Sequence, residues 1–280
     1  MTVNEFHEQL DAYYLSGDAA GAYRFLLDRR GAARAEDDRA MLLTADNALV
    51  GHCRENEIFG EIDTYYEEAL ACIEAMGLHG TQAEATTFLN MATACCRMGR
   101  DAESERLYDA AEALYRELLP PGDPFMAAVH NNRGLLLRAQ GKREAAFASF
   151  QKSRAILADC PGDVAAETAA TLLNLASVCP DQSEAAAYLA EAMEYYDGPD
   201  GRRDIHRFTA MATQAELRFR SGNYAGAGAA FEATAAAWEA TGGARQRLAV
   251  LYGNAQTCYE RAGDAEAAAR MRRKREEIAP

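Results

Sequence analysis

Asn131-Asn132-Arg133-Gly134-Leu135, followed by a turn at Gly141, is the stretch from which the fold can be inferred. Its second asparagine lies nine residues before the turn glycine. A polar residue recurs at this place in Asn90, Thr213 and Asn254, and Asn47 and Asn174 lie in matching contexts, so that the series is Asn47, Asn90, Asn132, Asn174, Thr213 and Asn254. The intervals are 43, 42, 42, 39 and 41 residues. A regular period of this length indicates a protein built from stacked structural repeats.

The turns between paired helices follow the same period. We place them near Gly17, Glu57, Gly99, Gly141, Asp181, Gly222 and Gly263. The sequence shows neither the alternation of apolar and polar residues typical of strands nor a hairpin signal, so the prediction is all-α. We expect one solenoid domain over residues 1–280 with seven helix pairs, at about 2–31, 36–77, 81–119, 124–160, 163–197, 202–241 and 244–278.

Small and large residues also recur at fixed distances from each turn. Small residues stand seven before it and five after it, which lets two helices approach closely. These residues are Ala92, Gly134 and Ala215 before the turn, and Ala22, Ser104, Ala146 and Ala227 after it. Bulky residues nine after the turn are predicted to fill the space between consecutive pairs: Leu26, Tyr108, Phe150 and Phe231.

This pattern resembles the tetratricopeptide repeat, in the longer form of about 42 residues found in kinesin light chains. The match is best over residues 131–152 and strong in the third, fourth and sixth pairs. The resemblance implies a right-handed superhelix whose first helices line a concave groove that binds a peptide or protein, without catalysis. In the last pair Arg272 replaces the bulky residue. We interpret the final helix as a polar cap, with a basic docking site as the alternative.

Composition narrows the class of partner. The net charge is −14 and the pI about 4.9, which disfavours nucleic acid because an acidic surface repels phosphates. The seven cysteines contain no Cys-x-x-Cys pair and fall mostly in helical patterns, as expected in a reducing cytoplasm. No signal peptide or membrane span is predicted. The excess of arginine and alanine over lysine weakly indicates a bacterial source.

The recurring amides are the candidate binding residues. The resemblance implies that an asparagine at this place points into the groove and bonds a ligand backbone, since an amide both donates and accepts. The alternative is that each asparagine bonds a neighbouring helix or water. The predicted groove residues are Asn47, Asn90, Asn131, Asn132, Asn174, Thr213, Asn254, Arg97, Arg138, Leu135, Thr93 and Ser177.

The two arginines of this set, Arg97 and Arg138, could hold a ligand carboxylate or could form salt bridges within the repeats. We find no phosphate-binding loop, nucleophile elbow or zinc pattern, so we predict no enzyme activity, no metal and no cofactor. The first hypothesis is a scaffold that holds an extended peptide. The alternatives are a signalling-peptide receptor or regulatory subunit that acts through a protein partner, and a structural homo-oligomer.

Overall fold

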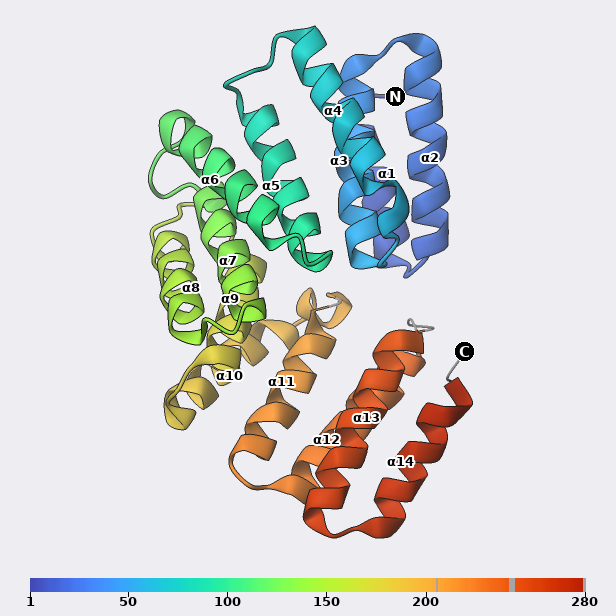
Figure 1. Ribbon diagram of the computed structural model, residues 1–280, viewed down its shortest axis with the longest axis vertical. Helices are drawn as coiled ribbons and strands as arrows, with labels where there is room; N and C mark the ends of the chain where they lie inside the picture. Colours follow the sequence, from blue (N-terminus) through green and yellow to red (C-terminus); the bar gives the residue numbers. More distant parts are fainter. Residues whose placement is uncertain (205, 242–244, 279–280) are drawn as a thin grey trace. The chain divides into compact units, whose positions relative to one another are not determined.

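The computed structural model describes residues 1–204, 206–241 and 245–278. Over these residues the chain is all-helical, with fourteen α-helices, two short 3-10 helices and no strand (Figure 1). It divides into two compact units, residues 1–160 and 161–280. The division falls at the sequence Cys160-Pro161-Gly162, where proline and glycine separate two helices. A single continuous domain and a right-handed superhelix remain predictions.

The first unit consists of four helix pairs. Its helices are α1 (Val3–Leu15), α2 (Ala19–Glu36), α3 (Arg39–Glu55), α4 (Ile62–Met76), α5 (Gln82–Arg97), α6 (Asp101–Leu118), α7 (Pro124–Ala139) and α8 (Arg143–Ala158), with the 3-10 helix η1 (Phe59–Glu61) before α4. Each helix packs against its partner in the pair. The first helices of successive pairs also touch, α3 against α5 and α5 against α7.

The second unit contains three pairs. Its helices are α9 (Ala165–Val178), α10 (Gln182–Tyr196), α11 (Arg207–Arg220), α12 (Tyr224–Glu239), α13 (Arg245–Ala262) and α14 (Ala265–Ile278), with the 3-10 helix η2 (Gly201–Arg203) before α11. Here too the partners in each pair pack together, and α9 touches α11. The predicted last repeat begins at residue 244, which lies outside the described residues, as do 205, 242–243 and 279–280.

Most of the turns that join the helices of a pair contain a residue with a positive φ. Gly141 has a φ of 76°, in the left-handed region where glycine pays no Cβ penalty. At Glu57 a non-glycine residue takes the same conformation, with a φ of 58°. Carboxylates cap helices both after such a turn and between pairs: Asp18 Oδ1 accepts from the Gly21 amide at 2.7 Å before α2, and Asp123, between the third and fourth pairs, precedes a proline in the first turn of α7.

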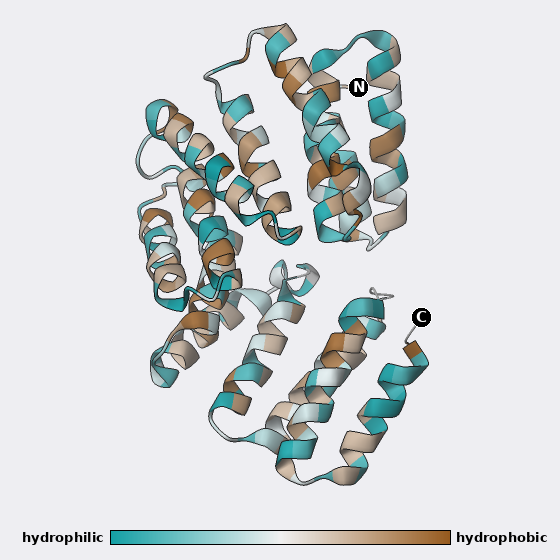
Figure 2. Cartoon of the chain, viewed as in Figure 1, coloured by the Kyte–Doolittle hydropathy of each residue, from teal (hydrophilic) through white to brown (hydrophobic). Residues whose placement is uncertain are grey.

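The recurring small and large residues lie in the core. All four small residues after the turn are fully buried, and so are Leu26, Tyr108 and Phe150. Gly134 lies against the ring of Phe150, and a Cβ built on Gly134 would be 2.4 Å from that ring. Along the helices apolar residues alternate with polar ones at helical spacing (Figure 2). α14 is the exception, being largely hydrophilic, with Arg272 exposed as expected for a cap.

Two predicted helix boundaries are wrong. The helix after Gly17 was expected to end at about residue 31, but α2 continues to Glu36, because Gly31 is accommodated within it and the following alanines favour helix. It ends at Asp37, whose φ is 53°. The first helix of the sixth pair was expected from residue 202. It begins at Arg207, because Asp204 is extended and its carboxylate accepts from the His206 amide.

Three further features concern the class of protein. In the part of the chain that the structure describes, no helix is long and apolar enough to span a membrane. All seven cysteines are free thiols, and Cys95 is fully buried in the core. Among the same residues no group of three histidine, cysteine or acidic side chains is arranged to hold a metal ion.

Candidate functional site

The asparagines of the first unit hydrogen-bond from one first helix to the next. Asn47 on α3 donates through Nδ2 to the Thr87 hydroxyl of α5 at 3.0 Å, and to the Leu43 carbonyl at 3.1 Å. Asn90 on α5 donates through Nδ2 to Asn47 Oδ1 at 3.1 Å. Two amides 43 residues apart in sequence therefore bond each other and tie α3 to α5.

The same kind of link joins α5 to α7. Asn132 Nδ2 donates to the Thr93 hydroxyl at 3.4 Å, and Asn131 Nδ2 donates to Asn132 Oδ1 at 3.4 Å. Thr93 in turn donates to the Leu89 carbonyl and accepts from the Tyr108 hydroxyl. The predicted groove residue Thr93 is thus a junction between three helices. We call Asn47, Asn90 and Asn132 the amide row.

The amide row corresponds to the second of the two interpretations of the asparagines, in which they bond neighbouring helices. It also keeps some capacity for a ligand. All three side chains are half-buried, so they are open to solvent. Asn90 Oδ1 accepts no hydrogen bond from any described residue, although a carboxamide oxygen can accept two. Inter-helix bonding fixes how these amides are oriented without saturating them.

The corresponding positions of the second unit are less uniform. Asn174 and Asn254 are half-buried, and the Asn174 carbonyl accepts from the Ser177 hydroxyl at 2.7 Å. Thr213 is only 6% exposed, so its side chain offers little surface to a ligand. A threonine at the asparagine position behaves here as a core residue, because its short side chain does not extend beyond its neighbours.

The predicted arginines lie near the C-terminal ends of their helices. Arg97 on α5 forms a salt bridge with Glu57, from the turn of the preceding pair, with 3.3 Å between Nη2 and Oε1. Both side chains are about half exposed, and such pairs contribute at most about 1 kcal/mol. Arg97 therefore pairs with the preceding repeat and not within its own, and replacement of Glu57 by a ligand carboxylate would cost little. Arg138 on α7 is exposed and Leu135 is half-buried.

Sequence reasoning missed a buried charge cluster beside the amide row. Asp46, the residue before Asn47, is completely buried and accepts from Arg30 Nε of α2 at 2.6 Å. Arg30 also contacts Glu68 of α4 at 2.5 Å, and Arg34 contacts the same carboxylate at 2.6 Å. Burial raises the pKa of Asp46, against the opposing effect of Arg30. The available signal was an acidic residue within the apolar stretch of residues 41–50.

Part of the chain matches a known protein family. A model of the tetratricopeptide repeat matches residues 83–159 and, overlapping these, residues 125–197. The matched segment includes Asn90, Asn132, Asn174 and the Gly134–Phe150 contact. Residues 83–197 carry tetratricopeptide repeats. A search of the curated proteins found no match.

Solved structures share the fold of this chain. BtubC (BKLC) from P. vanneervenii is 19% identical, with a TM-score of 0.60, and the match covers 76% of this chain and 86% of that one. A tetratricopeptide repeat protein from Parabacteroides merdae is 17% identical, with a TM-score of 0.56 and coverage of 99% and 93%. The TPR-like repeats of a putative kinesin light chain from Podosopora anserina are 16% identical, with a TM-score of 0.54 and coverage of 69% and 93%.

Proposed function

We propose that this protein is a non-enzymatic scaffold and that an extended peptide segment of a partner binds along α3, α5 and α7 at the amide row. The tetratricopeptide repeat fold generally mediates protein–protein interaction, which supports the wider class. The observation that carries the narrower proposal is the bonding of Asn47, Asn90 and Asn132 across successive helices. These bonds leave half-exposed amides in fixed orientations.

Fixed amides suit the binding of an extended chain. A peptide backbone presents one donor and one acceptor per residue, and a carboxamide matches either without reading the side chain. Side chains that are already immobilised lose little conformational entropy on binding, so more of the interaction energy appears as affinity. Arg97 and Arg138 add positive charge near one end of this surface, which favours a segment with a carboxylate at the corresponding end.

Selection of short peptides from a display library against the full chain tests the proposal. Selected peptides are then measured by fluorescence anisotropy against Asn90→Ala. We expect affinity to fall about tenfold, the equivalent of one hydrogen bond of about 1.4 kcal/mol. Gln151→Ala is the matched control, because it removes an exposed amide from the outer helix α8. Equal binding by the two variants would contradict the proposal.

Because Asn90 also bonds Asn47, its replacement could act through folding. Urea denaturation of both variants separates the two effects. Loss of binding counts in favour of the proposal only if Asn90→Ala is still fully folded at the temperature of the binding assay. Binding that is lost in proportion to unfolded protein would show that the amide row serves the fold alone.

We also propose that the protein works in the cytoplasm, bound to a protein partner rather than to nucleic acid or membrane. Cys96 and Cys160 are partly exposed and unpaired, which suits a reducing compartment. The net charge of −14 disfavours nucleic acid. Thiol titration of protein isolated from its native cells under acid quench would test the compartment, with seven reduced thiols per chain expected.

A further inference from the structure

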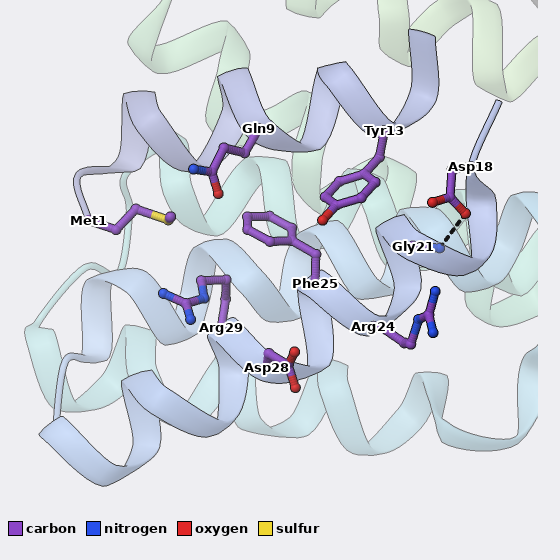
Figure 3. Close-up of a pocket in the computed structure, with 9 residues that line it drawn as sticks. All are labelled: Met1, Gln9, Tyr13, Asp18, Gly21, Arg24, Phe25, Asp28 and Arg29. Atoms are coloured by element: carbon purple, nitrogen blue, oxygen red, sulfur yellow. Dashed lines mark hydrogen bonds between the residues drawn. The ribbon is translucent and has the colours of Figure 1, made fainter. Parts of the chain in front are cut away.

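α2 carries charged side chains in two different surroundings. Figure 3 shows those that line the hollow beside α1, among them Arg24, Asp28 and Arg29. Each of these three is partly or fully exposed, so water solvates its charge. The side chain of Arg30, the next residue along α2, lies instead at the contact with α3 and α4 and is only 12% exposed. Charges buried at that contact need partners within the protein.

Four charged side chains from three helices meet there. Arg30 of α2 donates through Nε to Asp46 Oδ1 of α3 at 2.6 Å, and through Nη2 to Glu68 Oε2 of α4 at 2.5 Å. Arg34, one turn further along α2, donates to Glu68 Oε1 at 2.6 Å. The centroid of the Tyr65 ring, on α4, lies 4.8 Å from Arg30 Cζ. We call Arg30, Arg34, Asp46 and Glu68 the charge cluster.

Within the charge cluster, Asp46 receives too few hydrogen bonds for an ionised carboxylate. Its side chain is 0% exposed, and the donor to Oδ1 is Arg30 Nε. Its other oxygen, Oδ2, is buried and has no hydrogen-bond partner among the described residues. Glu68 differs, because it is 20% exposed and accepts from both arginines. A buried carboxylate with an unpartnered oxygen is strongly unfavourable, and such a group takes up a proton instead.

The two carboxyl groups also lie within hydrogen-bonding range of each other. An ionised carboxylate accepts hydrogen bonds but cannot donate, so a bond between Asp46 and Glu68 requires one proton. Burial raises the pKa of Asp46 to about 7, with Arg30 opposing the shift and Glu68 adding to it. Glu68 loses hydration too, but its bond to Arg34 and the charge of Arg30 lower its pKa. The proton therefore belongs on Asp46.

We infer that Asp46 and Glu68 share one proton, and that this proton controls how closely α3 packs against α2 and α4. With the proton bound, a neutral carboxyl and a carboxylate bond each other beside the two arginines. When the proton leaves to solvent, two carboxylates lie together and Arg30 is divided between them. The contact therefore loosens as pH rises through neutrality. α3 also carries Asn47, so this switch acts on a helix of the amide row.

The other ionisable groups at the charge cluster keep one charge state near neutral pH. Arg39 of α3 and the two arginines of α2 remain cationic. Burial raises the pKa of the Cys72 thiol of α4, and it also raises the pKa of the Tyr65 hydroxyl, so both are neutral. Among the described groups that face the charge cluster, the switch therefore depends on the pair of Asp46 and Glu68.

Carbon-13 NMR of the full chain, labelled at aspartate carboxyl carbons, tests whether the proton is shared. The Asp46 signal is the one that Asp46→Asn removes, and it should titrate near pH 7 instead of the ordinary 3.8. Glu68→Gln should lower this midpoint by at least about one pH unit, because the competing carboxylate is gone. Glu67→Gln is the matched control: it removes an exposed charge from the adjacent position of α4 and should leave the midpoint nearly unchanged.

Amide hydrogen exchange measures the packing itself. Between about pH 6 and about pH 8, exchange in α3, corrected for its intrinsic dependence on pH, should become several-fold faster in the wild type. The limit is about tenfold per pH unit, which is the limit for one proton. Asp46→Asn should show no such increase, because its amide donates a hydrogen bond at every pH.

Three results would overturn the inference. A midpoint of Asp46 near 3.8 would make the charge cluster a set of ordinary salt bridges. A raised midpoint that Glu68→Gln leaves unchanged would show that burial alone holds the proton. Equal exchange of α3 in the wild type and Asp46→Asn at both pH values would show that the proton does not affect packing. None of these measurements needs a bound peptide, so their outcome is independent of the proposed function.

Discussion

Replacement of Gly134 by alanine tests the packing of a repeat most directly. A Cβ at this position would lie 2.4, 2.6 and 2.8 Å from three ring carbons of Phe150, where ordinary contacts begin at 3.4 Å. The ring must therefore retreat by 1.0 Å at its nearest atom, the difference between 3.4 and 2.4 Å. Phe150 is completely buried, so this movement disturbs close-packed neighbours.

Two opposing effects determine how much Gly134→Ala changes the free energy of unfolding. Alanine is favoured over glycine within a helix by about 1 kcal/mol. Overpacking of a core costs about 1–3 kcal/mol. Because the ring has no exposed edge into which it can move, we expect the upper part of that range, and a net loss of about 1–2 kcal/mol in the free energy of unfolding. The matched control is Gly31→Ala in α2, where no atom lies within 4 Å and the residue is exposed. It should stabilise by up to about 1 kcal/mol.

Urea denaturation followed by circular dichroism measures both variants against the parent protein. Phe150→Leu supplies a second check, because a smaller side chain makes room for the new methyl group. The double variant Gly134→Ala/Phe150→Leu should then be more stable than the sum of the single changes allows. If Gly134→Ala is as stable as the parent while Gly31→Ala gains stability, the inferred contact between the two helices is wrong.

Three further predictions concern charged residues. Burial raises the pKa of Asp46 above its ordinary 3.8. The stability of the wild type, measured relative to Asp46→Asn, should therefore fall as pH rises from about 4. Parallel plots of stability against pH for the two proteins, from urea denaturation, would contradict this. His79 bonds two carboxylates that raise its pKa above 6.5. The loop stability it adds should be complete below pH 6.5 and lost above the raised pKa, and Glu74→Gln should lower its NMR titration midpoint. Arg220 Nη2 donates to the Cys179 carbonyl at 2.8 Å. Arg220→Ala should therefore destabilise the second unit by about 1–2 kcal/mol in urea denaturation, whereas Arg218→Ala, at an exposed control position, should destabilise it by much less. Equal effects of the two changes would show that the hydrogen bond adds nothing to stability.

The helix pairs and their close contacts could be predicted from the sequence, because both depend on the spacing of residues that are near each other in the chain. The turn at Gly141, the cap at Asp123 and the packing of Gly134 on Phe150 all depend on residues within about one repeat of each other. The error at Glu36 arose because Gly31, which lies inside α2, was taken for the end of a helix. The error at Arg207 arose because the capping role of Asp204 was not recognised, so the helix was started too early. Helix ends are decided by small energies, and single residues shift them.

The direction and the partners of the polar side chains depended on tertiary structure. The sequence places Asn47 and Asn90 at equivalent positions, but only the crossing of α3 and α5 brings their amides into contact. The same holds for Asp46 and Arg30. Periodicity determines which face of a helix a residue occupies. The packing of successive pairs decides which atom of a residue about 40 positions away lies opposite a given side chain. That packing cannot be inferred from residue spacing in the sequence.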